Sequence, residues 1–142
     1  MDRACSIEAR LRACVSTGPS SLTKSDRWIL SEWLVARDRV LHFEEPLLHH
    51  RQKTPYAEVD LILGSRLRSG PVTVIEVKSV SVREGAQLWA GEVVSRRQFA
   101  RLEKARWFVE LKSKRPTRLL LATVEAKLGD ANPLIRYFEA PF

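Results

Sequence analysis

The chain has 142 residues, of which 44% are hydrophobic and 29% charged, and this length and balance are typical of one globular domain with a single core. No apolar run approaches the ~18 residues of a membrane-spanning helix, and the N-terminal stretch lacks the apolar segment of a signal peptide. We therefore expect a cytoplasmic protein without a membrane partner. The formal net charge of +7 favours a polyanionic partner such as nucleic acid, although composition alone does not choose among anionic partners.

Residues 1–24 predict an N-terminal arm that contains at most a short helix, and residues 25–142 predict the domain proper. The first helix of that domain is expected from about Ser25 to Arg39, because apolar residues recur along it with helical spacing. Its predicted apolar stripe consists of Ile29, Trp33, Ala36 and Val40. An edge strand is expected at Val40–Pro46, since proline stops strand pairing. The basic residues that follow predict a turn within reach of a phosphate: His49, His50, Arg51 and Lys53.

Two strands joined by a polar loop are predicted in the middle of the chain. They are Ala57–Leu63 and Val72–Ser79, which are rich in apolar and β-branched residues. Because side chains alternate between the faces of a strand, acidic and basic residues of each strand share one face. If the strands pair antiparallel, three carboxylates and one ammonium group converge on a small area. These charged residues are Glu58, Asp60, Glu76 and Lys78.

Charges inside a sheet cost several kcal/mol unless they are paired, hydrogen-bonded or bound to a metal. One lysine cannot neutralise three carboxylates, whereas Mg²⁺ or Mn²⁺ binds carboxylate oxygens together with water and phosphate. The predicted metal ligands are Asp60, Glu76 and the main-chain carbonyl of Val77. Lys78 would orient a water molecule or stabilise transition-state charge, and Glu58 would support the site. The alternative is a solvated face with ordinary cross-strand ion pairs.

A second helix is predicted from Ser95 to about Ser113, followed by an inner strand at Arg118–Glu125 and a last strand at Leu134–Glu139. Gln98 begins the apolar stripe of this helix and could reach toward the predicted carboxylates. Residues 95–118 hold nine basic and two acidic residues, so the charge surplus of the whole chain lies here. We expect this surplus and the polar loop to hold a phosphate backbone. The predicted nucleic-acid-binding residues are Arg66, Arg68, Arg96, Arg97, Arg101 and Lys104.

An aspartate in one strand and Glu-x-Lys in the next resemble the signature of the PD-(D/E)XK nuclease superfamily, carried here by Asp60, Glu76 and Lys78. The longer stretches AEVDLIL and VIEVKS resemble the core of the YraN-like predicted endonucleases, which are similar to archaeal Holliday-junction resolvases. Val59 stands where the superfamily name has proline. The resemblance implies an α/β fold with a restriction-endonuclease-like core, in which helices flank a mixed central sheet in the order αβββαββ.

The resemblance also implies two supporting residues outside the strands. A glutamate in the first helix points toward the metals in the resembling family, and Glu32 stands at the matching position. The alternative is a surface ion pair of Glu32 with Arg39 or Lys24. A polar residue on the second helix supports the site in related nucleases, and Gln98 matches it, although lysine is frequent there.

These patterns together predict a metal-dependent endonuclease that hydrolyses phosphodiester bonds of DNA, with branched or recombining molecules as candidate substrates. RNA is an alternative substrate, and a homodimer is an alternative to a monomer. Two other functions stay open at this point. One is a nucleic-acid-binding protein that keeps the fold but does not cut, and the other is a basic protein-interaction domain.

Overall fold

The computed structural model describes residues 24–65, 67, 69–80, 93–125 and 134–142, so the predicted N-terminal arm lies outside the described residues except for Lys24. The elements follow one another as α2 (Lys24–Phe43), β1 (Leu47–Lys53), β2 (Glu58–Gly64), β3 (Val72–Ser79), α4 (Arg96–Ser113), β4 (Thr117–Glu125) and β5 (Leu134–Glu139). Within these ranges, no helix is both long enough and apolar enough to cross a membrane.

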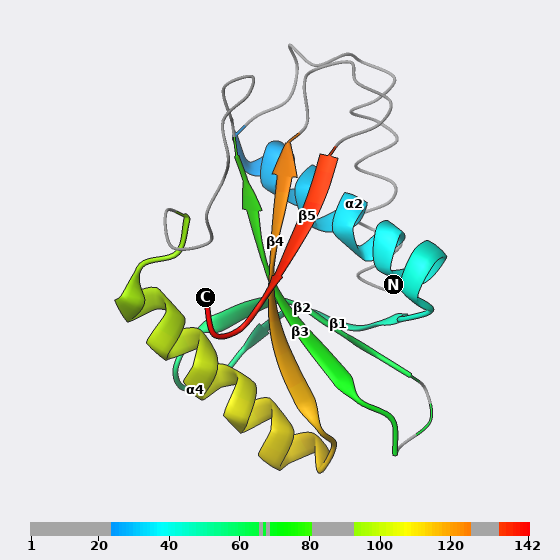
Figure 1. Cartoon of the computed structure of the whole chain (residues 1–142), viewed down its shortest axis with the longest axis vertical. Helices are drawn as coiled ribbons and strands as arrows, with labels where there is room; N and C mark the ends of the chain where they lie inside the picture. Colours follow the sequence, from blue (N-terminus) through cyan, green and yellow to red (C-terminus); the bar gives the residue numbers. More distant parts are fainter. Residues whose placement is uncertain (1–23, 66, 68, 81–92, 126–133) are drawn as a thin grey trace.

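The strands form one five-stranded sheet in the order β1-β2-β3-β4-β5. Its neighbouring strands are antiparallel except β3 and β4, which are parallel. A parallel pair needs a crossover connection, and α4 lies in that connection. Figure 1 shows the sheet between the two helices. The prediction of an α/β fold with a mixed sheet flanked by helices, in the order αβββαββ, is confirmed.

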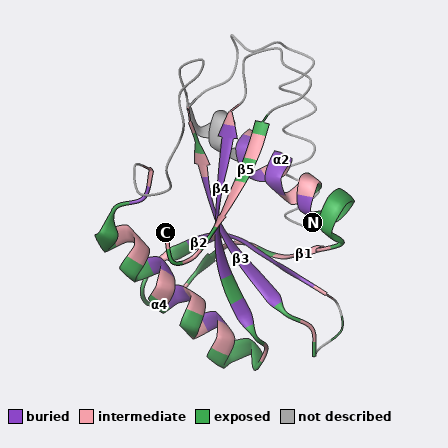
Figure 2. Cartoon of the chain, in the orientation of Figure 1, coloured by how far each residue is buried: buried purple, intermediate pink, exposed green. Residues whose placement is uncertain are grey.

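Both faces of the central strands are covered, which explains why their sequences are continuously apolar. In β3, Val72 and Val74 pack in the cluster that includes the buried face of α4, whereas Ile75 and Val77 pack in the cluster that includes α2. Figure 2 shows the buried residues concentrated in these strands. The sheet therefore separates two apolar layers.

The helix α4 begins and ends as its sequence predicts. The Ser95 hydroxyl accepts a hydrogen bond from the Gln98 main-chain N–H at 3.1 Å, which satisfies one of the free donors at the helix start. Lys114 adopts a left-handed conformation with φ 58° and closes the last turn. The apolar stripe that is predicted to start at Gln98 and to continue through Leu102, Ala105 and Val109 is confirmed, since the last three of these residues are buried.

The predicted edge strand at Val40–Pro46 is wrong. The helix α2 continues to Phe43, and Glu44 ends it with a left-handed backbone at φ 55°. The first strand is β1, which contains the segment that was expected to be a basic turn. The predicted stripe of α2 is also wrong at its end, because 47% of Val40 is exposed.

The predicted end and the predicted apolar stripe of α2 are wrong because charged residues occupy buried positions of this helix. Its buried positions include Glu32 and Arg39, which are 1% and 2% exposed. Arg39 forms an ion pair with Glu45, and its guanidinium lies 3.7 Å from the ring centroid of Phe43 and 4.7 Å from that of Tyr137. Hydrophobic periodicity cannot detect a helix face whose inward side chains are charged and paired.

Candidate functional site

The strands β2 and β3 cease to pair at one end, and this end holds two of the predicted carboxylates. Their pairing runs from Gly64–Val72 to Leu61–Ile75, so Asp60 and Glu76 follow directly beyond the last pair. The Asp60 carboxylate then accepts the main-chain N–H of Val77 at 2.8 Å. Because the N–H and C=O of a strand residue point to the same side, the Val77 carbonyl faces this side too.

Asp60 and Glu76 come within hydrogen-bonding reach of each other, as the predicted antiparallel pairing requires. Burial raises the pKa of Asp60 to about 6, against the lowering effect of the Val77 N–H. Burial, and next the charge of Asp60, raise the pKa of Glu76 to about 8, although Lys78 opposes this. Two buried carboxyl groups in contact cannot both ionise cheaply, so burial and mutual repulsion raise the pKa of the pair.

One oxygen of this pair lacks compensation. Glu76 is 7% exposed, and its Oε2 atom is buried with no hydrogen-bond partner in the described part of the structure. A buried polar atom without a partner costs about 1–3 kcal/mol, and an ion or a water molecule is the usual explanation. The carboxylate is therefore arranged to accept a ligand that carries positive charge or donates a proton.

The other oxygen of Glu76 is held from two elements. Its Oε1 atom lies 3.5 Å from Lys78 Nζ on the same strand and 3.5 Å from Gln98 Nε2 on α4. The structure thus brings together four of the predicted site residues, Asp60, Glu76, Lys78 and Gln98. Lys78 is partly exposed, so its ammonium group adjoins both the buried pair and solvent.

The residues fit a hard divalent cation better than a soft one. Two carboxylates and the Val77 carbonyl supply oxygen ligands, and Glu76 Oε2 is the buried atom in need of a partner. No group of three or more His, Cys, Asp or Glu side chains within the described ranges is placed to hold a metal. With two carboxylates and one carbonyl as protein ligands, a cation here would keep several water or substrate oxygens in its shell, which is the usual preference of Mg²⁺.

Glu32 reaches the same region from α2. It is buried, and its charge contributes to the raised pKa of Asp60, so the two carboxyl groups lie near each other. The alternative of a surface ion pair is wrong: the partners of Glu32 are His50 and Arg51 of β1. The sequence predicted both in a basic turn within reach of a phosphate but missed their contact with Glu32, because contacts between residues 18 and 19 positions apart follow only from the packing of α2 on β1.

Glu58 stands apart from the buried cluster. It is exposed at the start of β2 and lies opposite Lys53 in the register of β1 and β2. The supporting role of Glu58 therefore stays a prediction.

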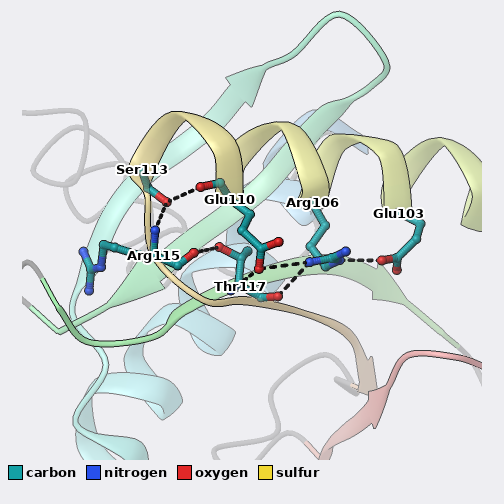
Figure 3. Close-up of polar contacts among 6 residues, drawn as sticks. All are labelled: Glu103, Arg106, Glu110, Ser113, Arg115 and Thr117. Atoms are coloured by element: carbon teal, nitrogen blue, oxygen red, sulfur yellow. Dashed lines mark hydrogen bonds and ion pairs between the residues drawn. The ribbon is translucent and has the colours of Figure 1, made fainter.

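The predicted nucleic-acid-binding residues of α4 are all exposed: Arg96, Arg97, Arg101 and Lys104. Arg66 and Arg68 lie outside the described residues. The two acidic residues of α4, Glu103 and Glu110, form ion pairs with Arg106, which also donates to the Thr117 carbonyl at 2.9 Å. Figure 3 shows Arg106 between the two carboxylates where α4 meets β4.

No protein-family model matches the chain, and no curated protein matches it with significant similarity. The resemblance to the nuclease superfamily therefore stays a prediction from the motif residues. What the site can do has to be inferred from its own geometry.

Proposed function

We propose that the chain is a cytoplasmic, metal-dependent endonuclease that hydrolyses phosphodiester bonds of DNA. The observation that carries the proposal is the buried pair of Asp60 and Glu76, with one unpartnered oxygen and Lys78 beside it, at the point where β2 and β3 separate. A pair of this kind destabilises the fold when it is ionised, so a bound cation is the simplest reason to keep it.

The carboxylate pair and its neighbours each have a role in this reaction. Asp60 and Glu76 would hold Mg²⁺ or Mn²⁺ together with the Val77 carbonyl. When bound, the cation polarises the phosphate and lowers the pKa of a water molecule. Lys78 would orient the attacking water and stabilise the negative charge on the phosphoryl oxygens in the transition state. Gln98 would keep the Glu76 carboxylate in place through its contact with Oε1.

The charge pattern of α4 supports a phosphate-bearing substrate. Arg97, Arg101 and Lys104 recur at i, i+4 and i+7 and are exposed, so they line one flank of the helix. The acidic residues Glu103 and Glu110 lie on another flank, where both form ion pairs with Arg106. The basic flank is thus left with an excess of positive charge that can contact a nucleic-acid backbone.

The first turn of α4 supports the same partner. It contains Arg96 and Arg97 and no acidic residue, although the positive end of the helix dipole favours acidic residues there by about 0.3–1 kcal/mol each. Gln98 of this turn contacts Glu76. Positive charge is therefore concentrated next to the buried pair, where an anionic substrate would approach it.

The mixed sheet and its two flanking helices are compatible with a restriction-endonuclease-like core, and we include that architecture in the proposal. Branched DNA is the substrate form that the motif residues favour. A second function, nucleic-acid binding without cleavage, is favoured by the α4 surface, because its exposed cations do not depend on the carboxylate pair.

The proposal is tested by cleavage of labelled duplex, single-stranded, flap and four-way-junction DNA, and of RNA, with Mg²⁺ or Mn²⁺. Wild type should cut at least one DNA form. Asp60→Asn and Lys78→Ala should each reduce the rate by about 100-fold or more, because each removes a group that acts on the transition state. Glu58→Gln, which changes an exposed residue of the same strand, is the matched control and should retain activity.

The outcomes separate the candidate functions. Absence of cleavage with both metals, together with salt-dependent DNA binding, would replace the enzyme by the non-cutting nucleic-acid-binding protein. Absence of both cleavage and DNA binding at low salt would leave the protein-interaction domain. Sedimentation of the protein with and without a four-way junction would show whether a homodimer forms.

A further inference from the structure

The carboxylate of Glu32 is held more firmly than ordinary burial requires. His50 Nε2 donates to Oε2 at 2.5 Å, and Arg51 Nε lies 3.2 Å from Oε2 and 3.3 Å from Oε1. The side chain of Glu32 is 1% exposed and that of His50 is 10% exposed. Both oxygens of one buried carboxylate are thus directed by two consecutive residues of β1.

Consecutive residues of a regular strand cannot do this, because their side chains point to opposite faces. Arg51 has a left-handed backbone with φ 51°, although β1 remains paired with β2 on both sides of it, through His50–Leu61 and Gln52–Val59. This conformation breaks the alternation and turns both side chains onto Glu32. A non-glycine residue in this region carries strain, which is retained where the surrounding structure determines it.

The kink in β1 lies opposite an irregular point of β2. Val59 and Ile62 both pack in the cluster beneath α4, whereas Leu61 packs beneath α2. Strict alternation would place Val59 and Ile62 on opposite faces, so the alternation of side chains is interrupted at Asp60, although the register with β1 is the same on both sides of this residue. Asp60 accepts the Val77 N–H at this point. Arg51 stands between the pairs His50–Leu61 and Gln52–Val59 and therefore opposite Asp60, so the guanidinium that contacts Glu32 comes from the position next to Asp60.

Stability alone does not explain this arrangement. A buried ion pair is often no more stabilising than apolar residues of the same volume, and the left-handed residue adds a further cost of about 1–3 kcal/mol. We propose that His50 and Arg51 are positioning residues that hold the Glu32 carboxylate beside Asp60 as a third negative group of the cation site. This inference rests on the proposed function.

The physical effect of Glu32 is electrostatic. A fixed negative charge near Asp60 attracts a divalent cation and orients the water molecules that complete its shell. Replacing a residue that orients a metal ligand without contacting the metal typically changes metal affinity by about 10- to 100-fold. His50 and Arg51 would therefore act on the cation through the position of Glu32.

The experiment measures Mn²⁺ binding to the purified full chain by calorimetry, with thermal melting of each variant as the control for folding. Glu32→Gln and His50→Ala should weaken Mn²⁺ binding by about tenfold or more. His50→Gln should restore most of the affinity, because its amide nitrogen can donate in place of Nε2. His49→Ala, which changes the exposed neighbour on the same strand, should bind Mn²⁺ as wild type does.

The result separates this inference from the function on which it rests. If Asp60→Asn abolishes Mn²⁺ binding while Glu32→Gln and His50→Ala bind as tightly as wild type, the positioning role is wrong and the metal site stands. If wild type itself binds no Mn²⁺, the proposed metal site fails and this inference fails with it. Equal losses in His50→Ala and His50→Gln, with unchanged melting, would contradict a role through the hydrogen bond to Glu32.

Discussion

The carboxyl group of Glu76 connects the stability of the protein to its proposed chemistry. Burial raises its pKa from 4.5 to about 8, and that of Asp60 from 3.8 to about 6. A carboxyl group whose pKa is higher in the folded than in the unfolded state binds more protons when folded. The free energy of unfolding must therefore fall as the pH rises from the unfolded-state pKa of each group to its folded-state pKa. This is the opposite of the usual behaviour of paired carboxylates.

We expect Glu76→Gln to be more stable than wild type at pH 8 in the absence of divalent cations. The amide cannot ionise, so the variant avoids the cost of a buried charge, which we place at roughly 1–3 kcal/mol. At pH 5 the difference should shrink below about 1 kcal/mol, because Glu76 then keeps its proton in the folded state. Urea unfolding with a chelator at both pH values measures this, and Glu58→Gln is the control at an exposed position.

Two results would contradict the assignment of this pH dependence to Glu76. One is a stability difference between Glu76→Gln and wild type that does not change between pH 5 and pH 8. The other is a loss of stability in the variant at pH 8. Addition of Mg²⁺ should stabilise wild type more than Glu76→Gln, because the stabilisation by a ligand of the folded state grows with the logarithm of its concentration relative to Kd.

At the scale of elements, α4 performs two tasks on different sides. Its buried stripe packs in the core, and Arg106 joins it to the start of β4 through Glu103, Glu110 and Thr117. Its basic flank remains at the surface. Because these tasks use different side chains, substitutions on the flank should change binding without changing the fold.

We expect Arg97→Ala, Arg101→Ala and Lys104→Ala each to weaken DNA binding and to reduce the slope of log affinity against log salt by about 1 when a phosphate contact is lost. The three variants should unfold at the same urea concentration as wild type. Filter binding across a salt series measures both affinity and slope. Arg136→Ala removes an exposed cation from β5 and is the control; an equal effect there would indicate diffuse charge rather than a defined surface.

The whole molecule is a layered structure whose central strands are the most completely buried elements. The strands β3 and β4 pair with each other and each has a further partner, β2 and β5 respectively. Apolar residues of both helices cover them. By contrast, β1 is an edge strand whose residues are half-buried or exposed, and it supplies His50 and Arg51.

Hydrogen exchange should show this gradient. We expect the amides of β3 and β4 to exchange only with global unfolding, and those of β1 to exchange through local openings of lower free energy. Exchange measured by NMR or mass spectrometry tests this. Protection of β1 equal to that of β3 would show that the edge opens only with the whole domain, in which case His50 and Arg51 would be as rigid as the core.

The sequence by itself determined the strands β2 to β5, the helix α4 and the order of the elements. The reason is local: continuous apolar runs mark strands that are covered on both faces, and Ser95 with the stripe of Leu102, Ala105 and Val109 marks a capped amphipathic helix. The spacing of Asp60, Glu76 and Lys78 also indicated that their side chains would meet, because antiparallel neighbours place nearby residues together.

Only the tertiary structure decided where α2 ends and what surrounds the site. Arg39 and Glu32 are buried with partners from outside α2, namely Glu45 for Arg39 and both His50 and Arg51 for Glu32, and a local pattern of hydrophobicity contains no record of such partners. The left-handed residue in β1 is likewise invisible in the sequence, since arginine has no preference for it. Contacts between distant elements settle the environment of a buried charge, and that environment determines whether the charge can bind a cation.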